Sequence, residues 1–166
     1  MQLVFKMKKN NTSYNFFSNS LRNKLMFFVF FLFFSAAVMS QETTLVALGN
    51  QSGAPSMMKL SELKSVLMGE KQRWENGNRV IIALMKTNTP IGKATSAKIY
   101  DMSGNELNKF WLALVFQGKA QAPNFFNSPN DLENFVAQNP GAIGILDKAM
   151  ADPEIKSIII DGQKTF

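Results

Sequence analysis

Short apolar runs rich in β-branched residues alternate with segments of helical periodicity along most of this chain, and that alternation restricts its fold more than any other feature. The apolar runs predict strands at Thr43–Leu48, Arg79–Met85, Gly141–Ile145 and Lys156–Ile160. Apolar residues at helical spacing predict helices at Leu60–Leu67, at Gly92–Met102, between Ser103 and Gly118, and between Ser128 and Pro140. This order predicts an α/β fold with a mixed, partly parallel sheet and flanking helices.

The helix that begins after Ser103 has the clearest local signals. Ser103 and Glu106 have the S-x-x-E spacing of a capping box, in which each side chain satisfies one free backbone N–H at the start of a helix. An apolar stripe follows, which we expect to face the core, at Leu107, Phe110, Trp111, Leu114 and Val115. The first helix has a weaker start, for which Ser61 is the candidate N-cap.

The first 40 residues differ in composition from the rest and predict an export signal. They contain five basic residues and no acidic one, and Leu25–Phe34 is a run of ten apolar residues followed by the small residues of Ser35–Ala37. This layout is typical of a secretory signal peptide with a basic n-region, whereas a membrane-spanning helix needs about 20 apolar residues. We expect residues 1–40 to be removed near Ser40 and residues 41–166 to form one domain. An uncleaved membrane anchor is the alternative.

Charge and composition exclude several classes of function. The chain has 18 basic and 12 acidic residues, but only 13 of the basic ones lie from Gln41 onward, which leaves the expected mature chain close to neutral. A protein that binds nucleic acid needs a dense cationic surface, so this class is excluded. The absence of Cys and His excludes thiol nucleophiles, imidazole triads and Cys/His zinc sites. The carboxylates are scattered and form no evident acid/base pair, and we therefore expect no enzyme activity, no metal site and no cofactor. The weaker alternatives are a carboxylate-dependent hydrolase and a metal site made of carboxylates alone.

Two polar loops follow predicted strands and are candidate anion sites. In the second loop, Gly92 and Lys93 resemble the end of the phosphate-binding motif G-x-x-x-x-G-K-[ST]. Thr87 replaces its first glycine and Ala94 its last hydroxyl residue, which excludes a nucleotide triphosphatase. A polar loop that opens a helix still presents backbone N–H groups and the positive end of a helix dipole to an anion. The alternative for both loops is a purely local role as turn and N-cap.

Trp74 has two interpretations. An amphipathic aromatic side chain can line a ligand cleft, or it can cover the end of the preceding helix. We favour packing, because aromatic residues of this kind commonly have that role.

Four stretches of the chain together resemble one protein family. They are Leu60–Trp74 (LSELKSVLMGEKQRW), Phe110–Lys119 (FWLALVFQGK), Asn139–Ile145 (NPGAIGI) and Ile158–Gly162 (IIIDG). They are similar to the phosphate-type substrate-binding proteins of ABC transporters, and specifically to the short, single-domain relatives of that family. The resemblance implies a fold like one lobe of a type II periplasmic binding protein, in which helix N-termini and hydroxyl groups surround an oxyanion.

The resemblance also implies a set of ligand-binding residues. By position, the loop after the second strand contacts the anion, while the first loop and the residue before the glycine-rich strand face the same cleft. The residues implied are Asn50, Gln51, Lys86, Thr87, Asn88, Thr89 and Gly141. The chain departs from the family in three ways, one of which is that Ile145 replaces an aromatic residue often found after Gly-Ala-Ile-Gly. In addition, Lys86–Thr89 replaces the Arg and Ser-Gly-Thr of the longer members, and the expected mature chain is long enough for little more than one lobe.

We therefore expect a periplasmic solute-binding protein that recognises phosphate or a similar small oxyanion for uptake or sensing. An ABC permease or another envelope protein would be its partner, and the membrane would be contacted only by an uncleaved signal sequence. This hypothesis requires the two loops and Gly141 to meet at one concave surface. The alternative is a protein of the same fold that binds no ligand and serves as an accessory or scaffold domain docked on an envelope protein.

Overall fold

The structure is a computed structural model that describes residues 43–148 and 152–166. The predicted signal peptide and its cleavage near Ser40 lie outside these residues, so the boundary at residue 40 stays a prediction. Residues 42–166 group into one unit, and its hydrophobic core is formed entirely by residues between Leu45 and Ile160. No helix in the described part of the chain is long and apolar enough to span the bilayer.

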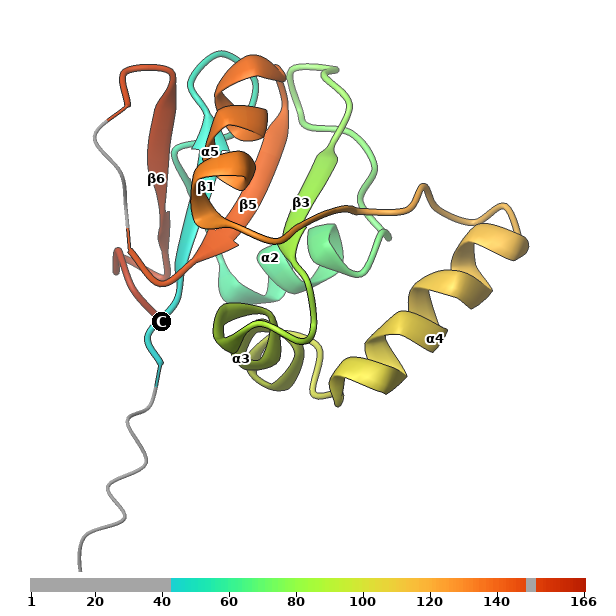
Figure 1. The fold of residues 1–166 in the computed structure, drawn as a ribbon. Helices are drawn as coiled ribbons and strands as arrows, with labels where there is room; N and C mark the ends of the chain where they lie inside the picture. The colour runs from blue at the N-terminus through green and yellow to red at the C-terminus, as the bar shows by residue number, and fades with distance from the viewer. Residues whose placement is uncertain (1–42, 149–151) are drawn as a thin grey trace, which may run out of the picture. The chain divides into compact units, whose positions relative to one another are not determined.

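Six strands form one mixed sheet in the order β2-β6-β1-β5-β3-β4 (Figure 1). The strands are β1 (Val46–Asn50), β2 (Met57–Met58), β3 (Ile81–Met85), β4 (Asn124–Phe126), β5 (Ala142–Leu146) and β6 (Ile155–Ile160). β1 lies in the middle and is antiparallel to both of its neighbours, β5 and β6. The remaining pairs are parallel, so the other five strands all run in one direction. The predicted α/β fold with a mixed, partly parallel sheet is confirmed.

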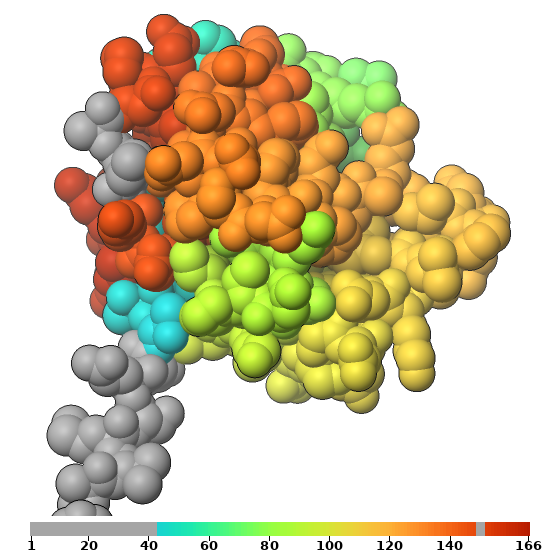
Figure 2. All heavy atoms as spheres, viewed as in Figure 1, coloured from blue at the N-terminus to red at the C-terminus, as the bar shows by residue number. Residues whose placement is uncertain are grey.

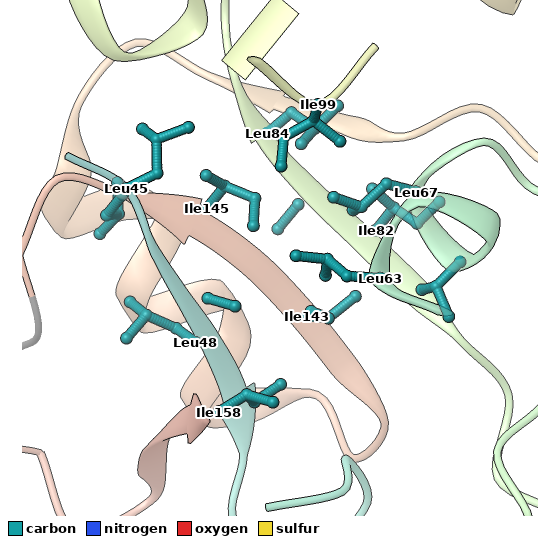
Figure 3. Close-up of a cluster of buried hydrophobic side chains, with 14 of the residues drawn as sticks. Leu45, Leu48, Leu63, Leu67, Ile82, Leu84, Ile99, Ile143, Ile145 and Ile158 are labelled. Atoms are coloured by element: carbon teal, nitrogen blue, oxygen red, sulfur yellow. The ribbon is translucent and has the colours of Figure 1, made fainter. Parts of the chain in front are cut away.

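The described residues contain four helices: α2 (Leu60–Leu67), α3 (Pro90–Lys98), α4 (Gly104–Phe116) and α5 (Pro129–Gln138). Gly144 of β5 faces α5, because a Cβ atom there would lie 2.6 Å from Leu132 Cδ2. Neighbouring residues of a strand point to opposite faces, so Ile143 points away from α5. On that other face Ile143 lies beside Leu63 of α2 (Figure 3). The sheet is therefore covered by α5 on one face and by α2 on the other.

α4 confirms its predicted start but not its whole predicted stripe. The Ser103 hydroxyl accepts from the Glu106 N–H, and the Glu106 carboxylate accepts from the Ser103 N–H, so the capping box is present. Leu107 and Trp111 are buried, whereas Val115 is 41% exposed, which makes its assignment to the core wrong. The physical reason is that α4 extends sideways from the sheet, so its far end packs less completely against the body (Figures 1 and 2).

Several predicted boundaries also shift. β1 begins three residues later than predicted and ends at Asn50, while α3 covers Pro90–Lys98 where Gly92–Met102 was expected. Ser61 is not a cap: the N-cap of α2 is Lys59, whose side chain makes no capping bond, and the Asp161 carboxylate accepts from the Leu60 N–H at 3.3 Å. The strands β2 and β4 were not predicted, because two or three residues are too short to show a period.

Candidate functional site

The two ends of the sheet have different chemistry, because β1 runs against the other five strands. We call the end where β2, β3, β4, β5 and β6 terminate the carboxyl end, and the end where β1 terminates the amino end. α2, α3 and α5 each follow one of the five aligned strands and therefore begin at the carboxyl end. The positive ends of three helix dipoles lie there, which favours an anion at the carboxyl end.

This arrangement separates the predicted site residues. Lys86, Thr87, Asn88 and Thr89 follow β3 and lie at the carboxyl end. Asn50 and Gln51 follow β1, and Gly141 precedes β5, so these residues lie at the amino end. The prediction that the two loops and Gly141 meet at one surface is wrong. Its physical reason is the antiparallel placement of β1, which no local pattern in the sequence reveals.

The first loop and Gly141 do meet, because a Cβ atom on Gly53 would lie 2.0 Å from the Gly141 nitrogen. Asn50 is only 2% exposed, and its side-chain amide donates to the Val136 and Ala137 carbonyls at 2.9 and 2.8 Å. These carbonyls belong to the last turn of α5, the negative end of its dipole. Asn50 thus has a structural role, and its surroundings disfavour an anion.

Gly141 serves the backbone in a similar way. Its φ of 83° lies in the left-handed region, and a Cβ atom would lie 2.3 Å from the Arg79 carbonyl oxygen. Its own carbonyl accepts from the Trp74 indole N–H at 2.8 Å and from the Ile81 N–H at 3.2 Å. Trp74 is 4% exposed, so the packing interpretation of this residue is confirmed, with Gly141 as its hydrogen-bond partner.

The loop after β3 is fixed by its own hydrogen bonds. The Lys86 N–H donates to the Phe126 carbonyl at 2.9 Å, which joins the ends of β3 and β4. The Thr89 hydroxyl donates to the Lys86 carbonyl at 2.8 Å and accepts from the Gly92 N–H at 3.0 Å. Thr89 is therefore the N-cap of α3, as the local interpretation of this loop predicts, and its hydroxyl is already occupied.

The middle of this loop retains free donors. In the described part of the chain, the backbone N–H groups of Thr87 and Asn88 have no acceptor, and the Asn88 side chain is exposed. The Asn108 side chain of α4 donates to the Thr87 hydroxyl at 3.3 Å. The start of α4 is equally close, since a Cβ atom on Gly104 would lie 2.8 Å from the Thr87 Cβ. The starts of α3 and α4 thus both border the loop.

Sequence reasoning missed the third helix start beside this loop. Because β4 was not predicted, nothing placed Asn127 and Ser128 next to Lys86. Ser128 is the N-cap of α5, and its hydroxyl accepts from the Asp131 N–H at 3.2 Å. The available signal was the apolar pair Phe125–Phe126 directly before the predicted N-cap.

Charges divide the carboxyl end into two parts. The exposed cations Lys86 and Lys93 flank the loop after β3. Near the end of β5 lies the buried Glu133, whose pKa is raised chiefly by loss of hydration, with a smaller lowering by Lys148 and further raising by the carboxylates that follow β5. The β3 side of the carboxyl end is therefore the more favourable side for an anion. Within the described residues, no group of three or more acidic, His or Cys side chains is arranged to hold a metal ion.

A separate groove of about 270 Å³ lies outside the carboxyl-end loop. Met57, Trp74 and Asn76 contribute to its walls. Lys71 and Glu62 also line it and form an ion pair at 2.5 Å. Trp74 thus borders a groove even though it is almost fully buried.

Several solved structures align with most of this chain. An ABC-type phosphate transport receptor from Vibrio cholerae aligns over 76% of this chain and 53% of its own, with a TM-score of 0.57 at 14% identity. A putative phosphate ABC transporter substrate-binding protein from Clostridium perfringens, with bound phosphate, aligns over 72% of this chain and 45% of its own, with a TM-score of 0.48 at 14% identity. PstS from Borrelia burgdorferi aligns over 72% and 48%, with a TM-score of 0.49 at 14% identity.

This chain spans about half the length of the Vibrio cholerae receptor. No protein-family model matches the sequence, and no curated protein matches it. At 14% identity the similarity shows the fold. The chain therefore has the α/β architecture of part of that phosphate transport receptor.

Proposed function

We propose that this chain is an exported, non-enzymatic solute-binding protein that takes phosphate or a similar small oxyanion at the loop Lys86–Thr89. The observation that carries the proposal is the position of this loop, next to the starts of α3 and α4 and joined to the end of β4 by the Lys86–Phe126 hydrogen bond. Recognition would use the free N–H groups of Thr87 and Asn88 together with the charge of Lys86.

The loop is open to solvent, which limits the expected affinity. An exposed anion stays partly hydrated, and each hydrogen bond to it then contributes less than in an enclosed site. Thr89 adds no free hydroxyl, since its oxygen already caps α3. We therefore expect a dissociation constant of about 1 mM, which corresponds to about 4 kcal/mol of binding free energy.

The setting of this function rests on the predicted export signal and on the fold. Removal of residues 1–40 would release the chain into the periplasm, where the partner would be an ABC permease or another envelope protein. The similarity to a phosphate transport receptor supports the choice of phosphate among oxyanions. Binding would involve no nucleic acid and no covalent step.

Isothermal titration of residues 41–166 with phosphate and with sulfate tests the proposal. Asn88→Asp and Gln51→Glu form a matched pair, because each adds one negative charge to an exposed loop, at the carboxyl end and the amino end respectively. We expect Asn88→Asp to abolish binding and Gln51→Glu to leave it nearly unchanged. The proposal fails if neither anion gives heat at about 10 mM, or if only Gln51→Glu abolishes binding.

One observation favours a second function, the docking domain. The outer side of α4 exposes Leu112 (58%), Val115 (41%) and Phe116 (83%), which are large apolar side chains on one helix. Contiguous exposed apolar side chains mark sites of protein association. A docking domain would show a stoichiometric envelope partner that is lost in a Leu112→Ser, Phe116→Ser variant while anion titrations give no heat.

A further inference from the structure

A second, smaller pocket lies at the start of β3. Its volume is about 60 Å³, and it is lined by residues of three segments: Gly69, Lys71 and Gln72; Arg79, Val80, Ile81 and Ile82; and Ala120, Gln121, Ala122 and Asn124. The charged side chains that line it are Lys71 and Arg79, and no carboxylate lines it. The other polar residues that line it are Gln72, Gln121 and Asn124, and the Asn124 side-chain amide also donates to the Ile82 carbonyl at 3.5 Å.

The strand pairing explains why this pocket exists. β4 pairs with β3 only from Ala83 onward, so β4 does not cover the backbone before that residue. The Val80 N–H donates to the Gln72 carbonyl at 3.0 Å, and the Gln72 side chain donates to the Lys119 carbonyl at 2.6 Å. Three separate segments are thereby tied together around the gap, and the walls of the pocket are held in place.

The positive charge at this pocket is only partly balanced. Lys71 is paired with Glu62, but Arg79 is exposed and has no ion pair in the described part of the chain. Arg79 also lies directly opposite Arg73 in an antiparallel bridge, which places two like charges on one face. Such a pair is unfavourable unless an anion compensates it. Arg73 turns its guanidinium away and donates to the Gly77 carbonyl at 3.0 Å.

We propose that this pocket binds a small oxyanion through the guanidinium of Arg79 and the side-chain amides of Gln121 and Asn124. A guanidinium binds an oxyanion with two parallel N–H donors, and the amides add neutral donors without a competing charge. The volume of about 60 Å³ has room for a few water-sized groups, which suits a small oxyanion and excludes a larger ligand from the pocket itself.

This site is separate from the one under the proposed function. Arg79 and Lys86 lie at opposite ends of β3, seven residues apart in sequence, which is roughly 20 Å along an extended chain. The inference therefore does not depend on anion binding at the loop Lys86–Thr89. The two sites are resolved by which backbone amides respond to the anion.

The test is a nuclear magnetic resonance titration of residues 41–166 with phosphate, sulfate and acetate at constant ionic strength. We expect saturable shifts of the backbone amides of Val80–Ile82 and of the side-chain amides of Gln121 and Asn124. Arg79→Gln should raise the dissociation constant obtained from these shifts about tenfold, because it removes the charged donor. Arg73→Gln is the matched control: it removes the same charge from the opposite residue, outside the pocket lining, and should weaken binding less than about threefold.

Two results would overturn the inference. One is the absence of saturable shifts at Val80–Ile82 up to about 50 mM anion. The other is an equal loss of affinity in Arg79→Gln and Arg73→Gln, which would mean that the two charges act only through a diffuse electrostatic effect. The Asn88→Asp variant separates this site from the proposed function, since it should suppress shifts at Thr87 and Asn88 while the shifts at Val80–Ile82 persist.

Discussion

At the scale of single residues, Asn50 shows that a polar side chain at the end of a buried strand can serve the fold alone. Its amide satisfies two carbonyls in the last turn of α5, and its oxygen accepts from the Ser52 N–H at 2.9 Å. Sequence reasoning could place Asn50 in a loop but could not find these partners, because they lie 86 and 87 residues away.

Replacing this residue tests the structural role. Asn50→Ala removes both bonds and leaves carbonyls of α5 without their partner, so we expect a loss of about 2 kcal/mol in the free energy of unfolding. Gln51→Ala is the control, because this side chain is exposed, and we expect a change below about 0.5 kcal/mol. Urea unfolding measures both. Equal stability of the two variants would contradict the role assigned to Asn50.

Glu133 makes the stability of the protein depend on pH. The carboxyl is 5% exposed, its Oε1 atom has no hydrogen-bond partner, and burial raises its pKa above the ordinary value of 4.5. The folded state thus holds the proton more tightly than the unfolded chain. The stability it contributes is fully present below pH 4.5 and is lost as the pH rises through the raised pKa.

The variant Glu133→Gln keeps the shape and removes this ionisation. We expect it to be more stable than the parent protein at pH 8, by about 1 kcal/mol, and equally stable near pH 4. Unfolding in urea at the two pH values measures the difference. A constant difference at both values would show that ionisation of Glu133 is not its source.

At the scale of elements, the helices were more predictable than the strands. The capping box of α4 and the Ser128–Pro129 start of α5 depend on neighbours within one turn, so the sequence contains all the information. The strands β2 and β4 exist because a longer strand lies beside them, and that partner is distant in sequence. The position of the loop Lys86–Thr89 after a strand was therefore predictable, whereas its neighbour Ser128 was not.

Two leucines of α4 test which side of this helix packs against the core. Leu107 is 1% exposed and Leu112 is 58% exposed on the same helix. Leu107→Ala should cost about 3 kcal/mol of unfolding free energy through the cavity it leaves. Leu112→Ala should change stability by less than about 0.5 kcal/mol. Thermal or urea unfolding of both variants measures this, and a comparable cost at Leu112 would mean that the outer side of α4 is packed in solution.

At the scale of the whole molecule, the direction of one strand decides where a ligand can be held. Because β1 is antiparallel to its neighbours, the predicted site residues lie at two different ends of the sheet. The helix dipoles are positive at the carboxyl end and negative at the amino end. The fold class follows from the alternation of strands and helices, which the sequence displays. The direction of β1 relative to the other strands depends on partners that are distant in sequence, so the residues around β1 do not predict it.

The central position of β1 in the sheet also affects when the sheet can form during synthesis. Val46 pairs with Leu146, and Ala47 pairs with Ile158, so β1 leaves the ribosome about 100 residues before the strands that pair with it. At about 5–20 residues per second, that interval lasts roughly 5–20 s. During that interval β1 is an unpaired hydrophobic segment, so we expect the sheet to close only after β5 and β6 have been synthesised.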